Sequence, residues 1–264
     1  MHVGVDGDVI LYQAAFAREA RGYIAYDEEG TPVAFSKFKK NVKDYPTVKP
    51  YSSVEIEDVE YACNIFNSKV ASIIRKTGAT SNTIYLTGKG NFRHELYDGY
   101  KASRGAKPLL YKVVRDHAEG LLTTVVIDGQ EADDALSIAQ YKNPDGHIIA
   151  TIDKDLLMVP GHHYNFNKDV TSYVTKEEGL RTFYQQILTG DSIDDIPGIK
   201  GIGPKKAEKI LEGMDEEEMW LTVLNTWAGV LQHDSVEDTV IRNAQLLWMR
   251  TKENEYWRPT VERM

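Results

Sequence analysis

His147-Ile148-Ile149-Ala150-Thr151-Ile152 is an apolar run rich in β-branched residues, and Asp153-Lys154-Asp155 follows it without a break. Runs of this length and composition are typical of a strand buried inside a parallel sheet. The acids stand where such a strand ends, and ligands of open α/β sheets bind beyond the carboxyl ends of the strands. The stretch therefore predicts a parallel strand with a functional site at its end.

Acidic residues recur where other expected elements begin or end. The apolar stretch His2–Asp6 ends in an acid, Asp8 follows it, and Glu131-Ala132-Asp133-Asp134 opens an expected helix. Asp191 and Asp194 form a later cluster. Carboxylates a few ångströms apart repel one another strongly unless cations share the site. Hard divalent cations such as Mg²⁺ take oxygen ligands and often handle phosphates, so we expect a metal site of this kind.

Expected strands and helices alternate along most of the chain. Thr83–Thr87 and Thr123–Ile127 are further apolar runs, whereas Val9–Ala20 and Ala132–Tyr141 are typical of helices. Ser53–Lys76 has apolar residues at helical spacing, with Ser53 as a candidate N-cap. This βαβα order predicts an α/β fold, a mostly parallel sheet flanked by helices.

Residues 23–51 interrupt that order. Tyr23–Tyr26 and Val33–Phe35 flank a turn rich in Asp, Gly and Pro, which is typical of a hairpin. A lysine-rich loop follows and ends near Pro50. We expect an insertion or a lid here, and the sequence leaves its purpose open.

The composition is that of an ordinary globular chain. Its 264 residues, 42% hydrophobic and 27% charged, suffice for one large domain or a core with a smaller appendage. No apolar run reaches the roughly 20 residues of a membrane helix, and a signal peptide is not apparent. The single Cys63 excludes an internal disulfide. We expect a cytoplasmic protein with no membrane partner, and its net charge of −9 argues against non-specific coating of nucleic acid.

A glycine-punctuated turn occupies residues 197–207, where the sequence reads Pro-Gly-Ile-Lys-Gly-Ile-Gly-Pro-Lys-Lys-Ala. Glycines let the backbone approach a ligand closely, and successive N–H groups at a helix start can hold a phosphate. The pattern resembles a helix-hairpin-helix element, which grips a nucleic-acid backbone without reading bases. An ordinary helix-turn-helix corner is the alternative. We expect a catalytic core over residues 1–185 and a helical region over 186–264.

Aromatic and cationic residues interleave in one segment near the middle of the chain. Phe92-Arg93-His94-Glu95 is followed by Tyr97, Tyr100-Lys101 and Arg104. Such a segment can stack on frayed bases while its cations neutralise phosphates. A plain amphipathic surface segment would show the same pattern.

Six motifs stand in a fixed order along the chain. They are Asp6-Gly7-Asp8, Phe92-Arg93-His94-Glu95 with Tyr100-Lys101-x-x-Arg104, Glu131-Ala132-Asp133-Asp134, Thr151-Ile152-Asp153-Lys154-Asp155-Leu156, Thr189-Gly190-Asp191 and Pro197–Gly203. Together they resemble the 5′-nuclease (flap endonuclease) superfamily, in particular the 5′→3′ exonuclease domain of bacterial DNA polymerase I and free-standing bacteriophage 5′-exonucleases. The resemblance spans roughly residues 1–212. We expect a stand-alone, phage-like enzyme.

The resemblance implies a PIN-like fold with a C-terminal helix-hairpin-helix (helix-three-turn-helix) region, and it implies roles for particular residues. The implied metal ligands are Asp6, Glu131, Asp133, Asp134 and Asp153 for a first ion, and Asp155, Asp191 and Asp194 for a second. Asp153, Asp155, Lys101 and Arg93 would be catalytic, the last two by contacting the scissile phosphate. The implied DNA-binding residues are Tyr100, Arg104, Gly198, Lys200, Gly201, Gly203, Lys205 and Lys206.

The implied activity is Mg²⁺-dependent 5′→3′ exonuclease or structure-specific flap endonuclease cutting in DNA replication or repair. The implied cofactors are two Mg²⁺ ions, with Mn²⁺ as a substitute, and K⁺ at the glycine turn. The implied partners are DNA with 5′ ends, flaps or nicks, RNA–DNA hybrids, and a replication polymerase.

One departure from the family pattern affects the metal site. The family usually has another acid at the end of the strand before Phe92, and here that place reads Leu86-Thr87-Gly88. A water, Thr87 or Asp8 would have to replace it. A non-catalytic structure-specific DNA-binding protein on the same fold is therefore an alternative. A PIN-class ribonuclease would not need the glycine turn, and an aspartyl-phosphate phosphatase would leave the later acids unexplained.

Overall fold

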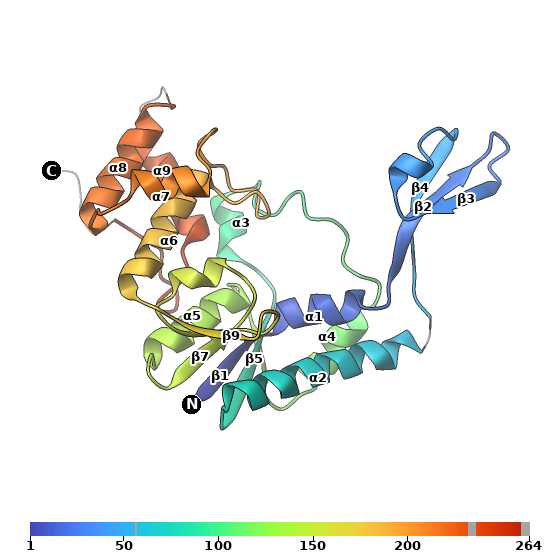
Figure 1. Ribbon diagram of the computed structural model, residues 1–264, viewed down its shortest axis with the longest axis horizontal. Helices are drawn as coiled ribbons and strands as arrows, with labels where there is room; N and C mark the ends of the chain where they lie inside the picture. The colour runs from blue at the N-terminus through green and yellow to red at the C-terminus, as the bar shows by residue number, and fades with distance from the viewer. Residues whose placement is uncertain (56, 232–235, 260–264) are drawn as a thin grey trace. The chain divides into compact units, whose positions relative to one another are not determined.

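The computed structural model describes residues 1–55, 57–231 and 236–259 (Figure 1). The strands are β1 (His2–Asp6), β2 (Ala20–Tyr26), β3 (Pro32–Ser36), β4 (Thr47–Ser53), β5 (Ser81–Thr87), β6 (Thr124–Ile127), β7 (His147–Ala150), β8 (Gly161–Asn165) and β9 (Val170–Val174). The helices are α1 (Gly7–Phe16), α2 (Asp58–Thr77), α3 (Phe92–Leu96), α4 (Tyr111–Glu119), α5 (Ala132–Lys142), α6 (Lys176–Thr189), α7 (Pro204–Ile210), α8 (Glu216–Ala228) and α9 (Val236–Leu247), with short 3-10 helices η1 (Lys39–Asn41) and η2 (Asp155–Met158).

The chain forms two compact units. The first comprises Met1–Asp8, Ile73–Gly105 and Thr123–Met264, and the second comprises Val9–Ser72 and Ala106–Leu122. The expected boundary near residue 185 lies inside the first unit and stays a prediction. None of the helices in the described ranges combines the length and the apolar character that a membrane-spanning segment needs.

The first unit is built on a six-stranded sheet in the order β6-β5-β1-β7-β8-β9. Every neighbouring pair is parallel except β8 and β9, so the predicted mostly parallel sheet is confirmed. β1 lies between β5 and β7 and pairs Asp6 with Tyr85 and Val5 with Ala150 (Figure 1). The carboxyl ends of these three central strands therefore meet at one edge of the sheet.

Helices cover this sheet and build the rest of the first unit. α5 packs against β1, β5 and β7, and α6 packs against η2, α7, α8 and α9. The buried aromatic rings of Phe183, Tyr184, Trp220 and Trp257 fill the space among these C-terminal helices. Residues 232–235, in the stretch expected to be helical, lie outside the described residues.

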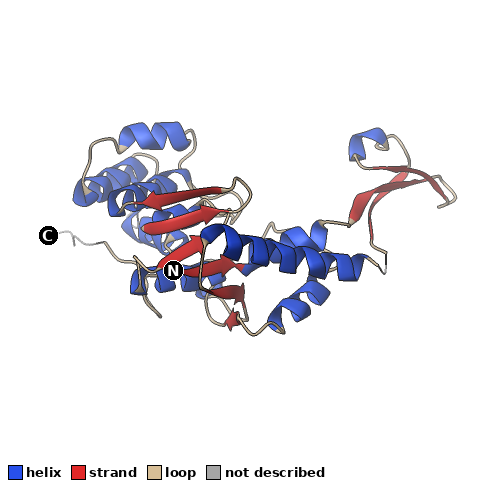
Figure 2. Cartoon of the chain, turned by 60° about the horizontal axis from the view of Figure 1, so that its bottom comes forward, coloured by secondary structure: helices blue, strands red, loops and turns tan. Residues whose placement is uncertain are grey.

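The second unit contains a three-stranded antiparallel sheet in the order β3-β2-β4, with η1 between β3 and β4 (Figure 2). The expected hairpin is β2 and β3, but the expected lysine-rich loop is in part a third strand, β4. The sequence did not indicate this strand because it contains Pro50, which argues against a strand. The proline is tolerated because β4 lies at the edge of the sheet. Ser53 ends β4, so it is not the N-cap of the following helix, which begins at Asp58.

Candidate active site

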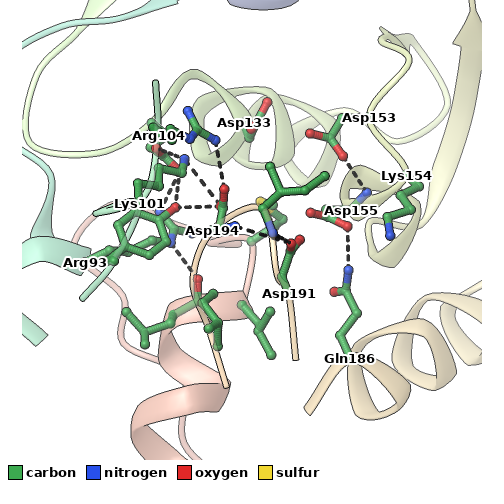
Figure 3. A pocket seen from close by; sticks show the side chains of 17 residues that line it. Arg93, Lys101, Arg104, Asp133, Asp153, Lys154, Asp155, Gln186, Asp191 and Asp194 are labelled. Carbon is green, nitrogen blue, oxygen red and sulfur yellow. Dashed lines mark hydrogen bonds and ion pairs between the residues drawn. The ribbon is translucent and has the colours of Figure 1, made fainter. Parts of the chain in front are cut away.

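Acidic side chains from separate stretches of the first unit line one pocket (Figure 3). The acids that line it are Glu131, Asp133, Asp153, Asp155, Asp191 and Asp194, and the basic residues are Arg93, Lys101, Arg104 and Lys154. Asp6 at the end of β1 is close enough to act electrostatically on Asp133. The expected convergence of distant acids at the sheet edge is therefore present in the fold.

A hydroxyl joins the ends of β1 and β7. Asp6 is 2% exposed, and its Oδ2 accepts a hydrogen bond from Thr151 Oγ1 at 2.6 Å. The same Thr151 oxygen accepts from the backbone N–H of Asp153 at 2.9 Å, and Asp153 Oδ1 accepts from the N–H of Asp155 at 2.9 Å. This chain of hydrogen bonds fixes the three acids relative to the sheet.

Several of these acids are destabilised in their ionised form. Burial first, and then the charges of Asp6 and Asp153, raise the pKa of Asp133 well above its usual range. Burial and the neighbouring carboxylates Asp153 and Asp191 raise the pKa of Asp155 to about 8. A cation placed among these oxygens would relieve both the desolvation and the mutual repulsion.

Glu131 behaves differently because cations already surround it. Burial acts to raise its pKa, but Arg93 and Lys101 outweigh burial and lower the pKa to about 2. Lys101 Nζ forms an ion pair with Glu131 Oε1, and the hydroxyl of Tyr100 donates to Oε2 at 2.8 Å. Glu131 is therefore a fixed anion at the start of α5.

Lys101 and Arg104 also hold Asp194. Arg104 Nη2 lies 2.8 Å from Asp194 Oδ1, and Lys101 Nζ lies 3.4 Å from Oδ2. Lys101 has a φ of 56°, a left-handed conformation that is uncommon for a residue with a side chain. Its backbone N–H donates to the carbonyl of Asp194 at 3.0 Å, which holds this conformation and directs the ammonium group into the pocket.

Arg93 and Asp134 form a buried ion pair with each other instead of taking the roles that the sequence predicted. Their side chains are 1% and 0% exposed, and two hydrogen bonds of 2.6 and 3.0 Å join them. Arg93 also donates to the carbonyls of Leu246 and Trp248. The expectation that Arg93 contacts the scissile phosphate and that Asp134 binds metal is not supported, because both groups are satisfied inside the protein.

Tyr100 also departs from its expected role. Its side chain is 2% exposed, so it presents no free ring face on which a base could stack. Burial and then Glu131 raise the pKa of Tyr100, so the hydroxyl keeps its proton and donates to Glu131 and Asp194. The aromatic ring is a support for the acids instead of a stacking platform.

The end of β5, where the 5′-nuclease family usually has another acid, is contacted by a carboxylate from the start of α1. Thr87 Oγ1 accepts a hydrogen bond from the N–H of Ala132 at the start of α5, at 2.9 Å. Asp8 Oδ2 accepts from the backbone N–H of Thr87 at 3.0 Å, so Asp8 brings a carboxylate to the end of β5. Asp8 therefore lies at the end of β5 but is not among the residues that line the pocket, and its role as the replacement stays a prediction.

Gln186 is a site residue that the sequence motifs did not indicate. Its Nε2 on α6 donates to Asp155 Oδ1 at 2.5 Å, and it lines the pocket. The sequence contains one indirect sign of this role, which the structure makes clear. Gln186 lies between the buried residues Tyr184 and Ile187, and a polar side chain in such a position needs a polar partner.

The glycine turn joins α6 to α7 and separates an apolar side from a basic one. Ile199, Ile202 and Ala207 are buried, whereas the lysines of the turn and of α7 are exposed; these are Lys200, Lys205, Lys206 and Lys209. Gly198 lies so close to the end of α6 that a Cβ would stand 2.0 Å from the carbonyl oxygen of Thr189. Gly201 has a φ of 83° and, like Gly203, faces open space.

The donor set fits hard divalent cations, since it consists of carboxylate oxygens whose charges repel one another. Among the residues that the structure describes, no group of three or more His, Cys, Asp or Glu side chains is already arranged to hold a metal ion. Lys101 and Arg104 occupy two of the acids, Glu131 and Asp194. A cation at either of these two acids would compete with the basic groups that already neutralise them.

Comparisons with known proteins add to this description. No family model matches the chain. It is 31% identical over 163 residues to thermostable DNA polymerase I of Thermus aquaticus, covering 56% of this chain and 20% of the polymerase. It is 30% identical over 148 residues to a 5′-3′ exonuclease of Bacillus subtilis, covering 47% of this chain and 49% of that protein. The chain thus matches about a fifth of the first relative and about half of the second.

Solved structures show the same relationship at the level of the fold. A bacteriophage T5 5′-exonuclease variant superimposes with a TM-score of 0.59 at 15% identity, covering 93% of this chain and 86% of that one. The T5 flap endonuclease in a pseudo-enzyme-product complex with DNA and metal ions gives a TM-score of 0.57 at 15% identity, with coverage of 93% and 88%. The chain is therefore similar in sequence to bacterial 5′-3′ exonuclease and DNA polymerase I and has the fold of T5 5′-exonuclease, which confirms its resemblance to the 5′-nuclease superfamily.

Proposed function

We propose that this chain is a divalent-metal-dependent 5′→3′ exonuclease or structure-specific flap endonuclease that hydrolyses phosphodiester bonds near 5′ ends of DNA. The observation that carries the proposal is the convergence of six carboxylates with Lys101 and Arg104 in one pocket beyond the carboxyl edge of the sheet. The similarity to a bacterial 5′-3′ exonuclease supports the same activity.

Two groups of acids would hold Mg²⁺, or Mn²⁺ in its place. The first group is Asp6, Glu131, Asp133 and Asp153, and the second is Asp155, Asp191 and Asp194. Asp8 would stand in for the family acid missing after Leu86. When bound, the ions would supply Lewis acidity and charge neutralisation at the reacting phosphate.

The basic residues of the pocket would then act on the substrate. Lys101, with a side chain 13% exposed, and Arg104, with one 47% exposed, are two of the cations in reach of a phosphodiester that enters the pocket. Both would offset the negative charge that develops on the phosphate oxygens during hydrolysis. Arg93 and Asp134 would position α3 and the start of α5 without touching the substrate.

The exposed lysines of the glycine turn and α7 would hold the duplex part of the substrate through its phosphates. Backbone carbonyls of the turn would suit K⁺. Nicked or flapped DNA and RNA–DNA hybrids would be the substrates, and a replication polymerase would be the protein partner in replication or repair.

A cleavage assay with a matched control tests the proposal. A 5′-labelled flapped duplex is incubated with Mg²⁺, with or without EDTA, beside Asp153→Ala and the surface variant Asp145→Ala. We expect cutting by the wild type and Asp145→Ala only when Mg²⁺ is available, and none by Asp153→Ala. Equal cutting by Asp153→Ala, or cutting in EDTA, would refute the assignment. Tight flap binding without any cutting by the wild type would favour the non-catalytic alternative.

A further inference from the structure

The three-stranded sheet of the second unit carries an aromatic residue on each strand. Tyr26 lies on β2, Phe35 on β3 and Tyr51 on β4. Directly opposed residues of an antiparallel pair point to the same face, and β2 pairs Ile24 with Phe35 and also with Lys49. Every second side chain of a strand points to the same face, so Tyr26 shares the face of Ile24, and Tyr51 shares the face of Lys49. The side chains of Tyr26, Phe35 and Tyr51 therefore lie on one face together with Lys49. We call this side of the sheet the aromatic face.

The contacts agree with this placement. The rings of Phe35 and Tyr51 meet edge to face with centroids 5.4 Å apart, and Lys49 Nζ lies 5.2 Å from the centre of the Tyr26 ring. Gly22, between β3 and β4, leaves room for this pair, because a Cβ there would stand 2.7 Å from the Phe35 ring. Phe35 is nevertheless 54% exposed. The Phe35 ring of this ordered pair is thus exposed on the sheet, while Tyr51 is half-buried.

Positive charge is concentrated in the segment from the end of β3 through β4. Between Ser36 and Ser53 the chain has five lysines and one aspartate, within a protein whose net charge is −9. The lysines are Lys37, Lys39, Lys40, Lys43 and Lys49, all exposed, and none takes part in the ion pairs found among the described residues. The neighbouring Phe38 is 62% exposed, with Lys40 Nζ 5.8 Å from its ring centre.

Cations without acidic partners next to exposed rings complement one class of ligand. Single-stranded nucleic acid offers a continuous line of phosphates together with unpaired bases that stack on aromatic side chains. A duplex hides those base faces, and a protein partner would not need a strip of unpaired lysines. The charge and the rings together therefore favour a single strand.

We propose that the aromatic face and the lysines of the β3–β4 connection bind single-stranded DNA. The choice of DNA rests on the proposed nuclease function, but the binding itself needs neither metal nor cleavage. The three-stranded sheet would give the chain a third nucleic-acid contact, in addition to the acidic pocket and the glycine turn.

Fluorescence anisotropy of the full-length protein with a labelled oligo(dT) strand in EDTA tests this inference. Phe35→Ala should weaken binding roughly 5- to 150-fold, the range for loss of one base–aromatic stack. Lys39→Glu with Lys40→Glu should weaken binding and reduce the slope of log K against log salt by about 1.4. The matched controls are Tyr173→Ala, an aromatic residue 56% exposed on β9, and Lys168→Glu with Lys176→Glu. Both controls should bind like the wild type.

Phe35→Leu keeps an apolar side chain without a ring, so it separates stacking from folding, and circular dichroism checks each variant. Three results would each overturn the inference. The first is full affinity of the Phe35→Leu variant, and the second is unchanged binding by the Lys39→Glu, Lys40→Glu variant. The third is a loss of binding that is seen only with duplex DNA or only with RNA. A wild type that binds the strand but cuts no flap in Mg²⁺ would refute the nuclease proposal and leave this one standing.

Discussion

Two hydrogen bonds join the guanidinium of Arg93 to the carboxylate of Asp134, at 2.6 Å from Nη1 and 3.0 Å from Nη2, with both side chains buried. Arg93 also donates to two carbonyls at the end of α9, and Asp134 accepts from the backbone N–H of Glu131 at 3.1 Å. The pair therefore connects α3, α5 and α9 directly behind the acidic pocket. Its loss should affect folding before it affects chemistry.

Neutralising the adjacent acids Asp133 and Asp134 should have opposite effects on stability. Asp134→Asn leaves the buried charge of Arg93 uncompensated, so it should lower the free energy of unfolding by about 3–5 kcal/mol. Asp133→Asn removes a carboxylate whose pKa is raised by burial and by Asp6, so stability should stay equal or rise, while metal-dependent cutting is lost. Urea unfolding of both variants in EDTA measures the difference. Equal destabilisation would contradict these assignments.

Substitutions at Lys101 should separate the effect of its charge on cutting from the effect of its backbone conformation on stability. Lys101→Ala and Lys101→Gly both remove the ammonium group, so both should lower the cutting rate roughly 10²–10³-fold, if the cation acts on the phosphate. Because φ is 56° at this position, the glycine variant should be more stable than the alanine variant by about 1 kcal/mol. Denaturant midpoints compare the two. A more stable alanine variant would mean that the left-handed backbone is not retained.

The glycines of the turn should divide into structural and exposed positions. Gly198→Ala places a Cβ 2.0 Å from the Thr189 carbonyl oxygen and should destabilise the protein strongly. Gly203 has a φ of −96° and nothing near its Cβ position, so Gly203→Ala should change stability by at most about 1 kcal/mol. Thermal unfolding tests the pair, and equal melting temperatures would show that the chain does not pack as closely at Gly198.

Lys205 and Lys206 should contribute to duplex binding through charge alone. Replacing both by glutamate should weaken binding of a nicked duplex in EDTA and reduce the slope of log K against log salt by about 1.8. The substitutions lie on the exposed side of α7, so the melting temperature should not change. Lys168→Glu with Lys176→Glu serves as the charge-matched control. An unchanged salt slope would assign the turn to another purpose.

His147 should make stability depend on pH in the mildly acidic range. Burial first, and then His2 and His163, lower the pKa of His147 to about 4. At pH 7.5 the imidazole is almost entirely neutral in both the folded and the unfolded state, so it has almost no effect on stability. As the pH falls below about 6.5, the unfolded chain binds a proton at His147 that the folded chain does not bind. The free energy of unfolding is therefore lower by about 2 kcal/mol at pH 5.

The control for this prediction is His147→Gln, which keeps a polar group opposite Gln140. The loss of stability between pH 7.5 and pH 5, measured by urea unfolding, should be about 2 kcal/mol smaller in the variant than in the wild type. Identical pH dependence of the two proteins would exclude His147 as its source.

The sequence predicted the sheet edge because that prediction depends on strand order alone. Buried strands show as apolar runs, and parallel strands end together, so Asp6 and Asp153 were expected at one edge and lie there. The helix after Glu131 was predicted from its own local sequence pattern. These features follow from local patterns combined with one topological rule.

The side-chain roles could not be predicted in the same way. α5 is buried on nearly all sides, so its pattern gave no sign that Asp134 faces Arg93 while Asp133 faces the pocket. Arg93 and Tyr100 were expected at the surface because their segment mixes aromatic and charged residues, whereas tertiary packing against the end of α9 and against Glu131 buries them. Such pairings join residues far apart in the chain, and no local pattern records them.

Lys101 and Arg104 give this protein counter-ions of its own for Glu131 and Asp194. Folding of the first unit therefore does not have to await magnesium at those two carboxylates. A divalent cation that bound at Glu131 or Asp194 would compete with these basic groups, and a group displaced in this way would be available to contact a phosphate.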